Sequence, residues 1–276
     1  MIPKPRRLIL GLLLAAEGHP LSVREAISAC ALFGISANSV RVALVRLSAD
    51  GLIEATERGS YRLSASAHEL ADDVATWRSA EQRMRPWEGG WLAVHTAGLG
   101  RSDRVALRRR SRALAMLGFR ELEGGLYLRP DNIEDSVDAV RKRLHTLGLE
   151  KQAPVFVAGH FDATREAAIR KLWDGKALNA SYRKLRTQLE EWMARADKLE
   201  LEAAARESYL MGSNAIRHVV YDPLLPAPLV DAEARHAFVE TVRRYDSAGQ
   251  EIWRRLGSIS GSTGNSAATR SGSPSR

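Results

Sequence analysis

With 276 residues, the chain is long enough to bury a sizeable core and to hold two or three domains. Hydrophobic residues make up 45% of it and charged residues 27%, which is typical of a soluble globular protein. The formal net charge of +8 favours a polyanionic partner: nucleic acid, an anionic surface or a phosphorylated ligand. The single cysteine, Cys30, excludes an internal disulfide and indicates a reducing cytoplasm; it follows Ile27 at helical spacing and is expected in the core.

The first apolar run, LILGLLLAA over residues 8–16, follows three cationic residues and imitates a secretory signal. It is far too short to span a bilayer as a helix. The helices after it need an apolar cover, and Leu8, Leu12 and Ala15 lie at spacings of four and three. We therefore predict a first core helix in a cytoplasmic protein with no membrane partner.

The next stretch carries the signals of two helices joined by a tight turn. Ser22 and Glu25 form a capping box at the start of the first helix, which runs to about residue 33. Gly34 makes the turn, and the second helix begins at Ser36 and is ended by Gly51. This spacing predicts a helix-turn-helix.

Two short strand-like runs follow, over residues 52–56 and 60–63, joined by a turn at 57–59. Helix, turn, helix and two-stranded ribbon form the plan of a winged helix-turn-helix, predicted here over residues 1–64. Such a module inserts its second helix into the major groove, so we expect duplex DNA as a partner.

The outward face of the second helix supplies the candidate DNA contacts. These are Ser36, Asn38, Ser39, Arg41, Val42, Val45 and Arg46, with Arg58 at the wing tip. Serine hydroxyls suit phosphate oxygens, Asn38 suits adenine, Arg41 suits guanine, and a valine can meet a thymine methyl. Arg46 is expected on the backbone, and Arg58 in the minor groove or on a phosphate. The alternative is a set of solvated side chains on an ordinary helix.

The middle of the chain alternates short apolar runs with helical segments. Residues 65–88 form a predicted connecting helix that Pro86 closes. Residues 89–160 then read β-α-β-β-α-β, the order of a ferredoxin-like domain. The whole chain is therefore predicted to be α+β.

The rest of the chain is helical. Residues 161–257 form a predicted helical C-terminal domain, and residues 258–276 a disordered tail with too little apolar area to order it. One helical seam is either an internal packing seam, which we favour, or a coiled-coil dimer contact. Its members are Tyr182, Leu185, Leu189, Trp192, Ala196 and Leu199.

Several strings of this sequence, in order, resemble the PaaX-type transcriptional repressors, the phenylacetic acid catabolism regulators. They are ALFGISANSVRVALVRLSADGLIE, RGSYRL, WRSAEQRMRPWEGGWLAVH, LGFRELEGGLYLRPDN and DPLLPAPLV. The resemblance implies a winged-helix domain, a Cas2-like ferredoxin-fold middle domain and a helical C-terminal domain. It also implies that a homodimer binds an operator and is released by an aryl-CoA thioester, typically phenylacetyl-CoA. One departure is that a Trp-Pro-Gly turn is expected where this chain reads Asp231-Ala232-Glu233.

An arginine cluster in the middle domain permits several interpretations. It comprises Arg104, Arg108, Arg109, Arg110 and Arg112. The cluster is a solvated face, or it holds the phosphates of an acyl-CoA effector, extends the DNA footprint, or pairs with acids of a partner subunit. For an effector, Arg108, Arg109 and Arg112 are the candidate phosphate ligands. Trp91 and Tyr127 are then candidates for an aryl pocket, with a core position as the favoured alternative.

No catalytic residue, metal ligand or cofactor is expected. The first strand of the middle domain lacks an acidic residue, and Asp103 reads as a helix cap. HExxH, GxSxG, P-loop and GxGxxG motifs are all missing from the sequence. Besides a ligand-responsive repressor, the sequence leaves open an architectural DNA-binding protein without a ligand and a metal-dependent nuclease.

Overall fold

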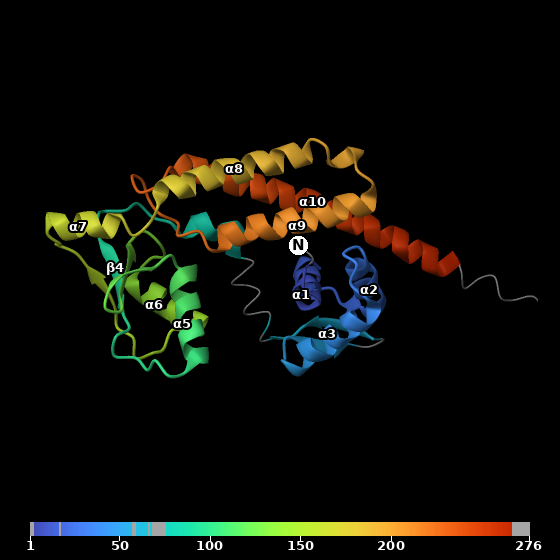
Figure 1. Cartoon of the computed structure of the whole chain (residues 1–276), viewed down its shortest axis with the longest axis horizontal. Coiled ribbons are helices and arrows are strands. Elements are labelled where there is room, and N and C mark those ends of the chain that lie inside the picture. The colour runs from blue at the N-terminus through green and yellow to red at the C-terminus, as the bar shows by residue number, and fades with distance from the viewer. Residues whose placement is uncertain (1–2, 17, 57–58, 66, 68–75, 267–276) are drawn as a thin grey trace, which may run out of the picture. The chain divides into compact units, whose positions relative to one another are not determined.

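The structure, a computed structural model, describes residues 3–16, 18–56, 59–65, 67 and 76–266. The chain divides into two compact units, each assembled from separate stretches. The first comprises Met1–Thr76, Trp192–Gly212 and Arg244–Arg276; the second comprises Trp77–Glu191 and Ser213–Arg243. Helices and two antiparallel sheets make up the α+β fold that the sequence predicts (Figure 1).

The first unit contains the predicted helix-turn-helix and ribbon. Its N-terminal helices are α1 (Pro5–Ala15), α2 (Val23–Ala31) and α3 (Ala37–Ala49). Its sheet has the order β1-β3-β2, with β1 at Leu21–Ser22, β2 at Ile53–Thr56 and β3 at Ser60–Leu63. Strands β2 and β3 pair antiparallel, with Thr56 opposite Ser60. The short strand β1, which the sequence analysis missed, adds to the ribbon through Leu21 opposite Tyr61.

Helix α1 is part of the core of this unit, although its buried face differs from the predicted one. Leu8, Ile9 and Leu13 are buried, whereas Leu12 is only partly buried and Ala15 is exposed. The face is shifted because α1 packs against α2, α3 and β3 together. No helix among the described residues is long and apolar enough to cross a membrane.

Cys30 lies in the same core, as predicted. Its side chain is fully buried, and burial raises the pKa of the thiol to about 11. The thiol therefore stays protonated near neutral pH and packs as a small apolar group.

Two further helices contribute to this unit: α9 (Leu201–Val220) and α10 (Ala232–Ser266). Tyr209 of α9 meets the ring of Phe33 edge-on at 5.4 Å between centroids. Trp192 packs on Tyr245 of α10 at 4.8 Å. The rings of Tyr209 and Phe33 thus tie α9 to the turn that precedes α3.

The second unit is built around a four-stranded antiparallel sheet of order β5-β6-β4-β7. Its strands are β4 (Trp91–His95), β5 (Arg120–Glu123), β6 (Leu126–Pro130) and β7 (Val155–Ala158), with α5 (Arg104–Met116) and α6 (Val137–Leu147) as crossovers. Since β4 lies between β6 and β7, each β-α-β crossover passes over one neighbouring strand. This arrangement is the predicted ferredoxin-like one.

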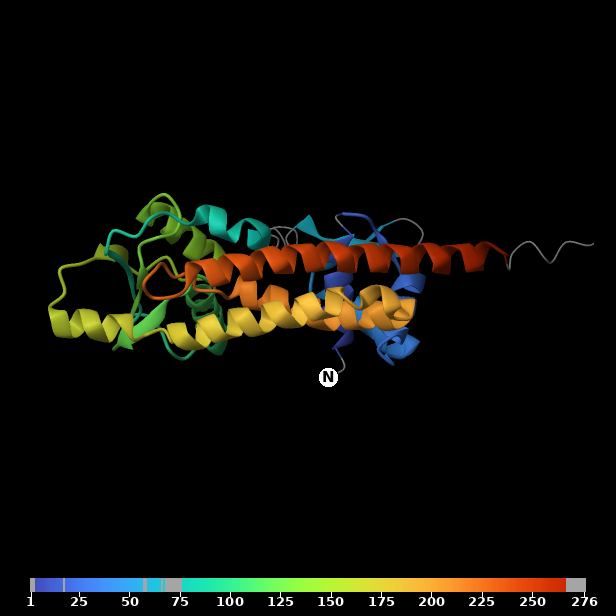
Figure 2. The same ribbon diagram turned by 90° about the horizontal axis from the view of Figure 1, so that it is seen from above.

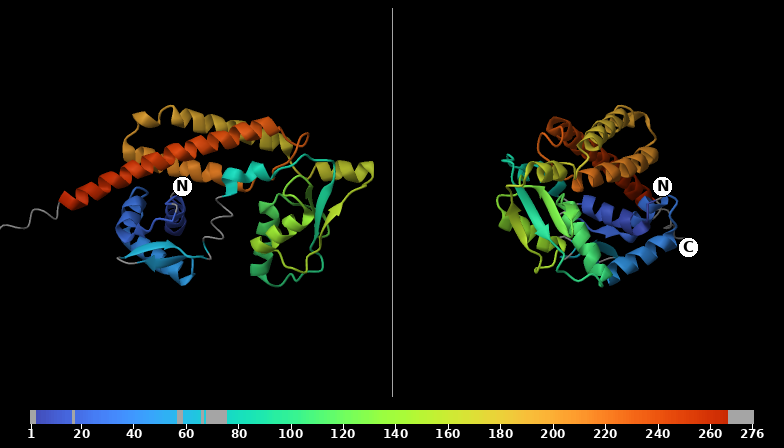
Figure 3. Two further views of the ribbon diagram at one scale, coloured as in Figure 1. Left: turned by 180° about the vertical axis from the view of Figure 1, so that it is seen from behind. Right: turned by 60° about the vertical axis from the view of Figure 1, so that its left-hand side comes forward.

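Helices α5 and α6 cover one face of this sheet (Figure 3). Leu92 and Val94 of β4 pack there against Leu114 of α5 and Leu144 of α6. Alternate residues of a strand point to opposite faces, so Trp91 lies on the other face. There its indole donates a hydrogen bond to Glu166 of α7 (Ala163–Arg170).

The predicted apolar seam of residues 182–199 packs against other helices of the same chain. Tyr182 and Leu189 of α8 (Gly175–Met193) and Trp192 are buried. The ring of Tyr182 stacks on Phe238 of α10 at 5.9 Å between centroids. The favoured interpretation, an internal seam, is confirmed for these residues.

Three boundaries differ from the sequence-based expectation. The connecting helix is, within its described part, a 3-10 helix η1 over Thr76–Arg83. The helical residues 161–257 do not form a unit by themselves, because the long helices α8, α9 and α10 each contribute residues to both units. Helix α10 continues to Ser266 (Figure 2), past the start of the predicted tail, since propagation of a formed helix costs little.

Candidate nucleic-acid interface

The start of α2, the helix that precedes α3, is fixed by local hydrogen bonds that the sequence predicts. The backbone N–H of Glu25 donates to Ser22 Oγ at 3.1 Å, and the N–H of Ser22 donates to Glu25 Oε2 at 2.8 Å. Gly34 then has φ +71°, in the left-handed region that residues other than glycine rarely adopt. The capping box thus sets where α2 begins, and Gly34 forms the turn between α2 and α3.

Ser36 and Ser39 lie at the start of α3. Ser36 Oγ accepts the backbone N–H of Ser39 at 3.3 Å, and the two hydroxyls share a hydrogen bond of 3.0 Å. Ser36 is therefore the helix cap, and its hydroxyl is already engaged within the chain. The first turn carries no acidic side chain, so no like charge opposes a phosphate there.

One face of α3 is buried and the other is exposed. The buried stripe is Val40, Ala43, Leu44 and Leu47, as the helical period predicts. The predicted contact residues all lie outside that stripe and are all exposed: Asn38, Ser39, Arg41, Val42, Val45 and Arg46. Val42 is 42% exposed and Val45 is 66% exposed, which is unusual for branched apolar side chains on a helix.

The arginines on this face are available to a partner. Helix α3 contains no Asp or Glu. Within the described part of the chain, neither Arg41 nor Arg46 forms an ion pair or a hydrogen bond through its side chain. An exposed helix face with cations, an amide and small apolar groups matches the mixed chemistry of a major groove.

The ribbon next to α3 is the predicted wing. Arg62 of β3 donates to Glu54 of β2 at 2.6 Å across the two strands. Gly59, at φ +71°, follows the tip. Arg58 lies outside the described residues, so its contact with the minor groove or a phosphate stays a prediction.

The arginine cluster of α5 separates into one buried and several exposed residues. Arg110 is 6% exposed; its Nε donates to Glu150 at 3.1 and 3.2 Å, and its Nη2 donates to the carbonyl of Gly100 at 3.0 Å. The hydrogen bond from Arg110 holds the pKa of the Glu150 carboxyl below its usual value, and the same bond raises the pKa of Arg110. The other members of the cluster are exposed: Arg104, Arg108, Arg109 and Arg112.

The structure does not bring the candidate effector residues into one pocket. Trp91 is fully buried; it stacks on Trp173 with 6.0 Å between ring centroids and meets Trp87 edge-on at 5.2 Å. Tyr127 lies opposite Val94, on the face that α5 and α6 cover. Trp91 and Tyr127 thus lie on opposite faces of the sheet. The two rings therefore do not line one pocket together, because the pairing register of β4 with β6 fixes the face of each ring. The burial of Trp91 agrees with the core position that the sequence analysis favoured.

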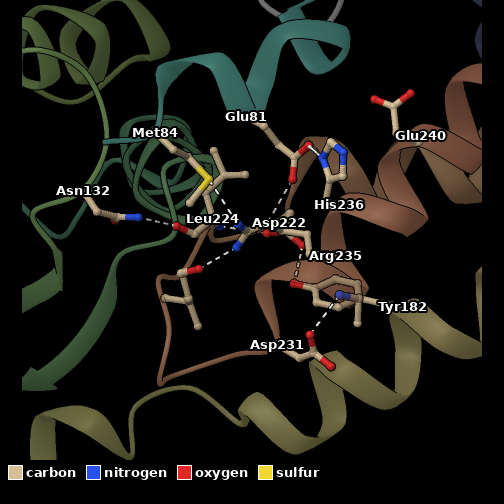
Figure 4. Close-up of polar contacts among 12 residues, drawn as sticks. Glu81, Met84, Asn132, Tyr182, Asp222, Leu224, Asp231, Arg235, His236 and Glu240 are labelled. Carbon is tan, nitrogen blue, oxygen red and sulfur yellow. Dashed lines mark hydrogen bonds and ion pairs between the residues drawn. The ribbon is translucent and has the colours of Figure 1, made fainter. Parts of the chain in front are cut away.

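A buried polar network that the sequence analysis did not identify holds the DPLLPAPLV segment (Figure 4). The hydroxyl of Tyr182 donates to Asp222 at 2.6 Å, and Arg235 donates to the carbonyl of Leu225 at 2.5 Å. Arg235 also pairs with Glu81 at 3.3 Å. Burial raises the pKa of both Asp222 and Tyr182. An acid in an apolar, proline-rich segment was the only local signal of this network, since its partners are far apart in sequence.

Local hydrogen bonds of Asp231 account for the departure at this position. Its side chain accepts the backbone N–H of Ala234 at 2.9 Å and so caps α10. It also accepts a hydrogen bond from Arg183 at 2.7 Å. The residues that replace the expected Trp-Pro-Gly turn therefore begin a helix in this chain.

Among the described residues, no group of three or more His, Cys, Asp and Glu side chains is placed to hold a metal ion. Asp103 caps α5 as predicted, by accepting the N–H groups of Val105 and Ala106 at 2.7 and 3.2 Å.

Comparison with known proteins agrees with this geometry. A family model described as PaaX-like protein matches residues 4–67, and one described as PaaX-like protein C-terminal domain matches residues 173–255. No curated protein matches the chain. Among solved structures, the chain is similar to the uncharacterized protein Rv0674 of Mycobacterium tuberculosis. The TM-score is 0.54 at 23% sequence identity, over 90% of this chain and 99% of that one. A likeness at this identity shows the fold alone.

Proposed function

Since the chain belongs to the PaaX-like family of transcriptional regulators, we propose that it represses its target genes by placing α3 in the major groove of an operator. The observation that carries this proposal is the outward face of α3. Arg41 and Asn38 lie on that face next to two exposed valines, and no acid of α3 neutralises it.

Each group on this face has a chemical counterpart in DNA. The planar guanidinium of Arg41 can donate to both O6 and N7 of guanine, and the Asn38 amide can bond N6 and N7 of adenine. Val42 or Val45 can contact a thymine methyl. Arg46 and the serines at the start of α3 can donate hydrogen bonds to phosphate oxygens. Base contacts specify sequence, so Asn38 and Arg41 are the specificity determinants in this proposal.

The proposed assembly on DNA is a homodimer. Two copies of α3 related by a two-fold axis read two half-sites spaced by about one helical turn, roughly 34–36 Å. This symmetry predicts an inverted repeat in the operator.

Selection from a random duplex pool tests the proposed function directly. The purified full-length chain is expected to enrich one sequence with two related half-sites. A reporter gene placed behind that sequence is expected to be repressed when the protein is present. A pool that shows no preferred sequence after selection contradicts the proposal.

We also propose that an aryl-CoA thioester such as phenylacetyl-CoA is the effector, and that phenylacetate-like acid catabolism is the regulated pathway. The support is the family resemblance of the sequence. A ligand that binds the folded state raises its stability, by about 2.7 kcal/mol at a concentration 100 times its Kd. Phenylacetyl-CoA is therefore expected to raise the Tm in a thermal-shift assay and to weaken binding to the selected operator.

Free coenzyme A and phenylacetate are the matched controls for this experiment. Each carries one half of the thioester, and each is expected to shift the Tm less than the intact molecule does. An unchanged Tm with every aryl-CoA tested contradicts the effector proposal and leaves operator binding intact as an independent result.

A further inference from the structure

Three of the four exposed arginines of α5 form a regular array. Arg104, Arg108 and Arg112, here named the α5 stripe, lie four residues apart and are all exposed. Four residues advance a helix by about 6 Å and turn it by roughly 40° beyond a full turn, so the three guanidinium groups follow one side of the helix over about 12 Å. The stripe is a line of positive charge on the surface of the second unit.

Several other exposed arginines of this chain form an ion pair with an acidic residue about one helical turn away. Arg186 pairs with Glu190, Arg170 with Glu166, and Arg254 with Glu251. Helix α5 has no Asp or Glu at all. Among the described residues no side-chain hydrogen bond or ion pair involves an arginine of the stripe. Asp103, which precedes Arg104, is engaged as the helix cap.

The buried arginine of α5, Arg110, has its charge compensated by a partner inside the protein. Arg110 is satisfied by Glu150 and by the carbonyl of Gly100. Like charges four residues apart repel one another, so the outward stripe lowers the stability of the isolated helix. Nothing in the packing of α5 requires these three charges, which indicates a role towards a partner.

The shape of the array favours an extended polyanion over a small ligand. Arginine is the side chain best suited to bidentate phosphate contacts, and a line of three suits consecutive phosphates of a nucleic-acid strand. Of the two aromatic candidates for an effector site, Trp91 is buried on the opposite face of the sheet. Tyr127 lies on the face that α5 covers, but its hydroxyl already donates to Glu121 at 3.2 Å. Val105 is exposed next to the stripe, but it is a single apolar side chain.

We propose that the α5 stripe binds the phosphate backbone of duplex DNA, as a sequence-independent contact separate from the base contacts of α3. The proposal rests on the proposed function, because the operator is the polyanion that a DNA-binding regulator always meets. The stripe adds affinity for any duplex and leaves the choice of sequence to α3.

The test compares two triple variants with the same decrease in positive charge. The first is Arg104→Gln, Arg108→Gln and Arg112→Gln. The matched control is Arg183→Gln, Arg186→Gln and Arg254→Gln, which removes three exposed arginines that are ion-paired. Glutamine favours the helix nearly as well as arginine does. Binding of the full-length protein to a random duplex is measured over a range of salt concentrations.

The stripe variant is expected to flatten the plot of log Kobs against log salt by about 0.9 for each phosphate that is no longer neutralised, so by roughly 2 to 3 in slope. Its affinity for the random duplex is expected to fall about tenfold or more at moderate salt, with little change in the control. The ratio of affinities for the selected and random duplexes is expected to stay the same, because phosphate contacts carry no sequence information.

Equal salt slopes for the two triple variants overturn the proposal. It is also overturned if the stripe variant loses a thermal shift with free coenzyme A and keeps its salt slope, since the arginines then hold a nucleotide ligand. If the triple variant fails to fold, Arg108→Gln alone is expected to change the slope by about 0.9. The random duplex tests the stripe even when selection finds no operator, so failure of the proposed function is recognised separately.

Discussion

Replacing Arg41 by alanine is expected to weaken binding to the selected operator by about 1–3 kcal/mol, or roughly 5- to 150-fold. The side chain is exposed on α3, and the helix carries no acid to compensate its charge. A guanidinium that donates two hydrogen bonds to one guanine leaves both acceptors unsatisfied when it is removed. The weakening should fall mainly on the selected sequence, so the ratio of affinities for selected and random duplexes also decreases.

Arg186→Ala provides the control for this measurement. Arg186 is an exposed arginine of α8 that pairs with Glu190, and its removal subtracts the same charge. Fluorescence anisotropy with labelled operator and random duplexes compares the two variants. If Arg41→Ala weakens both duplexes equally, Arg41 contacts phosphate and does not read a base. If it weakens neither, α3 is not the recognition helix.

Replacing Trp91 by alanine is expected to destabilise the protein by about 3–5 kcal/mol. The indole is fully buried, stacks on Trp173 and donates to Glu166 at 3.0 Å. Alanine leaves a cavity between β4 and the neighbouring aromatic rings, and it leaves the Glu166 carboxylate without the indole N–H. The expected result is therefore a large fall in the free energy of unfolding, measured by urea denaturation, whether or not an effector is present.

Phe156→Ala is the comparison for Trp91→Ala. Phe156 is an aromatic residue of the same sheet, on β7, and is 41% exposed, so its removal leaves no enclosed cavity and is expected to cost clearly less. A Trp91→Ala protein of unchanged stability that no longer responds to phenylacetyl-CoA would restore the aryl-pocket role for this residue.

Local signals explain why the recognition helix could be predicted without a structure. Ser22, Glu25 and Gly34 act on backbone groups within a few residues, and the structure places them in those roles. The buried stripe of α3 follows from the helical period alone. Even the ferredoxin-like order of elements is readable, because each strand and helix has its own local pattern of apolar residues.

Long-range pairing decided what the sequence left open. The face on which Trp91 and Tyr127 lie depends on the register of β4 against β6, and a shift of one residue would exchange the two faces. Arg235 and Glu81 form an ion pair across 154 positions of sequence, for which no local pattern exists. The sharing of α8, α9 and α10 between two units likewise depends on which residues meet in the folded chain.

By itself the sequence determined the helix-turn-helix, the outward side chains of α3 and the internal character of Cys30, because caps, periodicity and side-chain polarity act over a few residues. Only the tertiary structure decided which arginine of α5 is neutralised and which three make up the exposed stripe. That choice depends on where Glu150 and the carbonyl of Gly100 lie after folding. Packing thus pairs Arg110 with groups inside the protein, whereas the arginines of the α5 stripe stay exposed and can bind a partner.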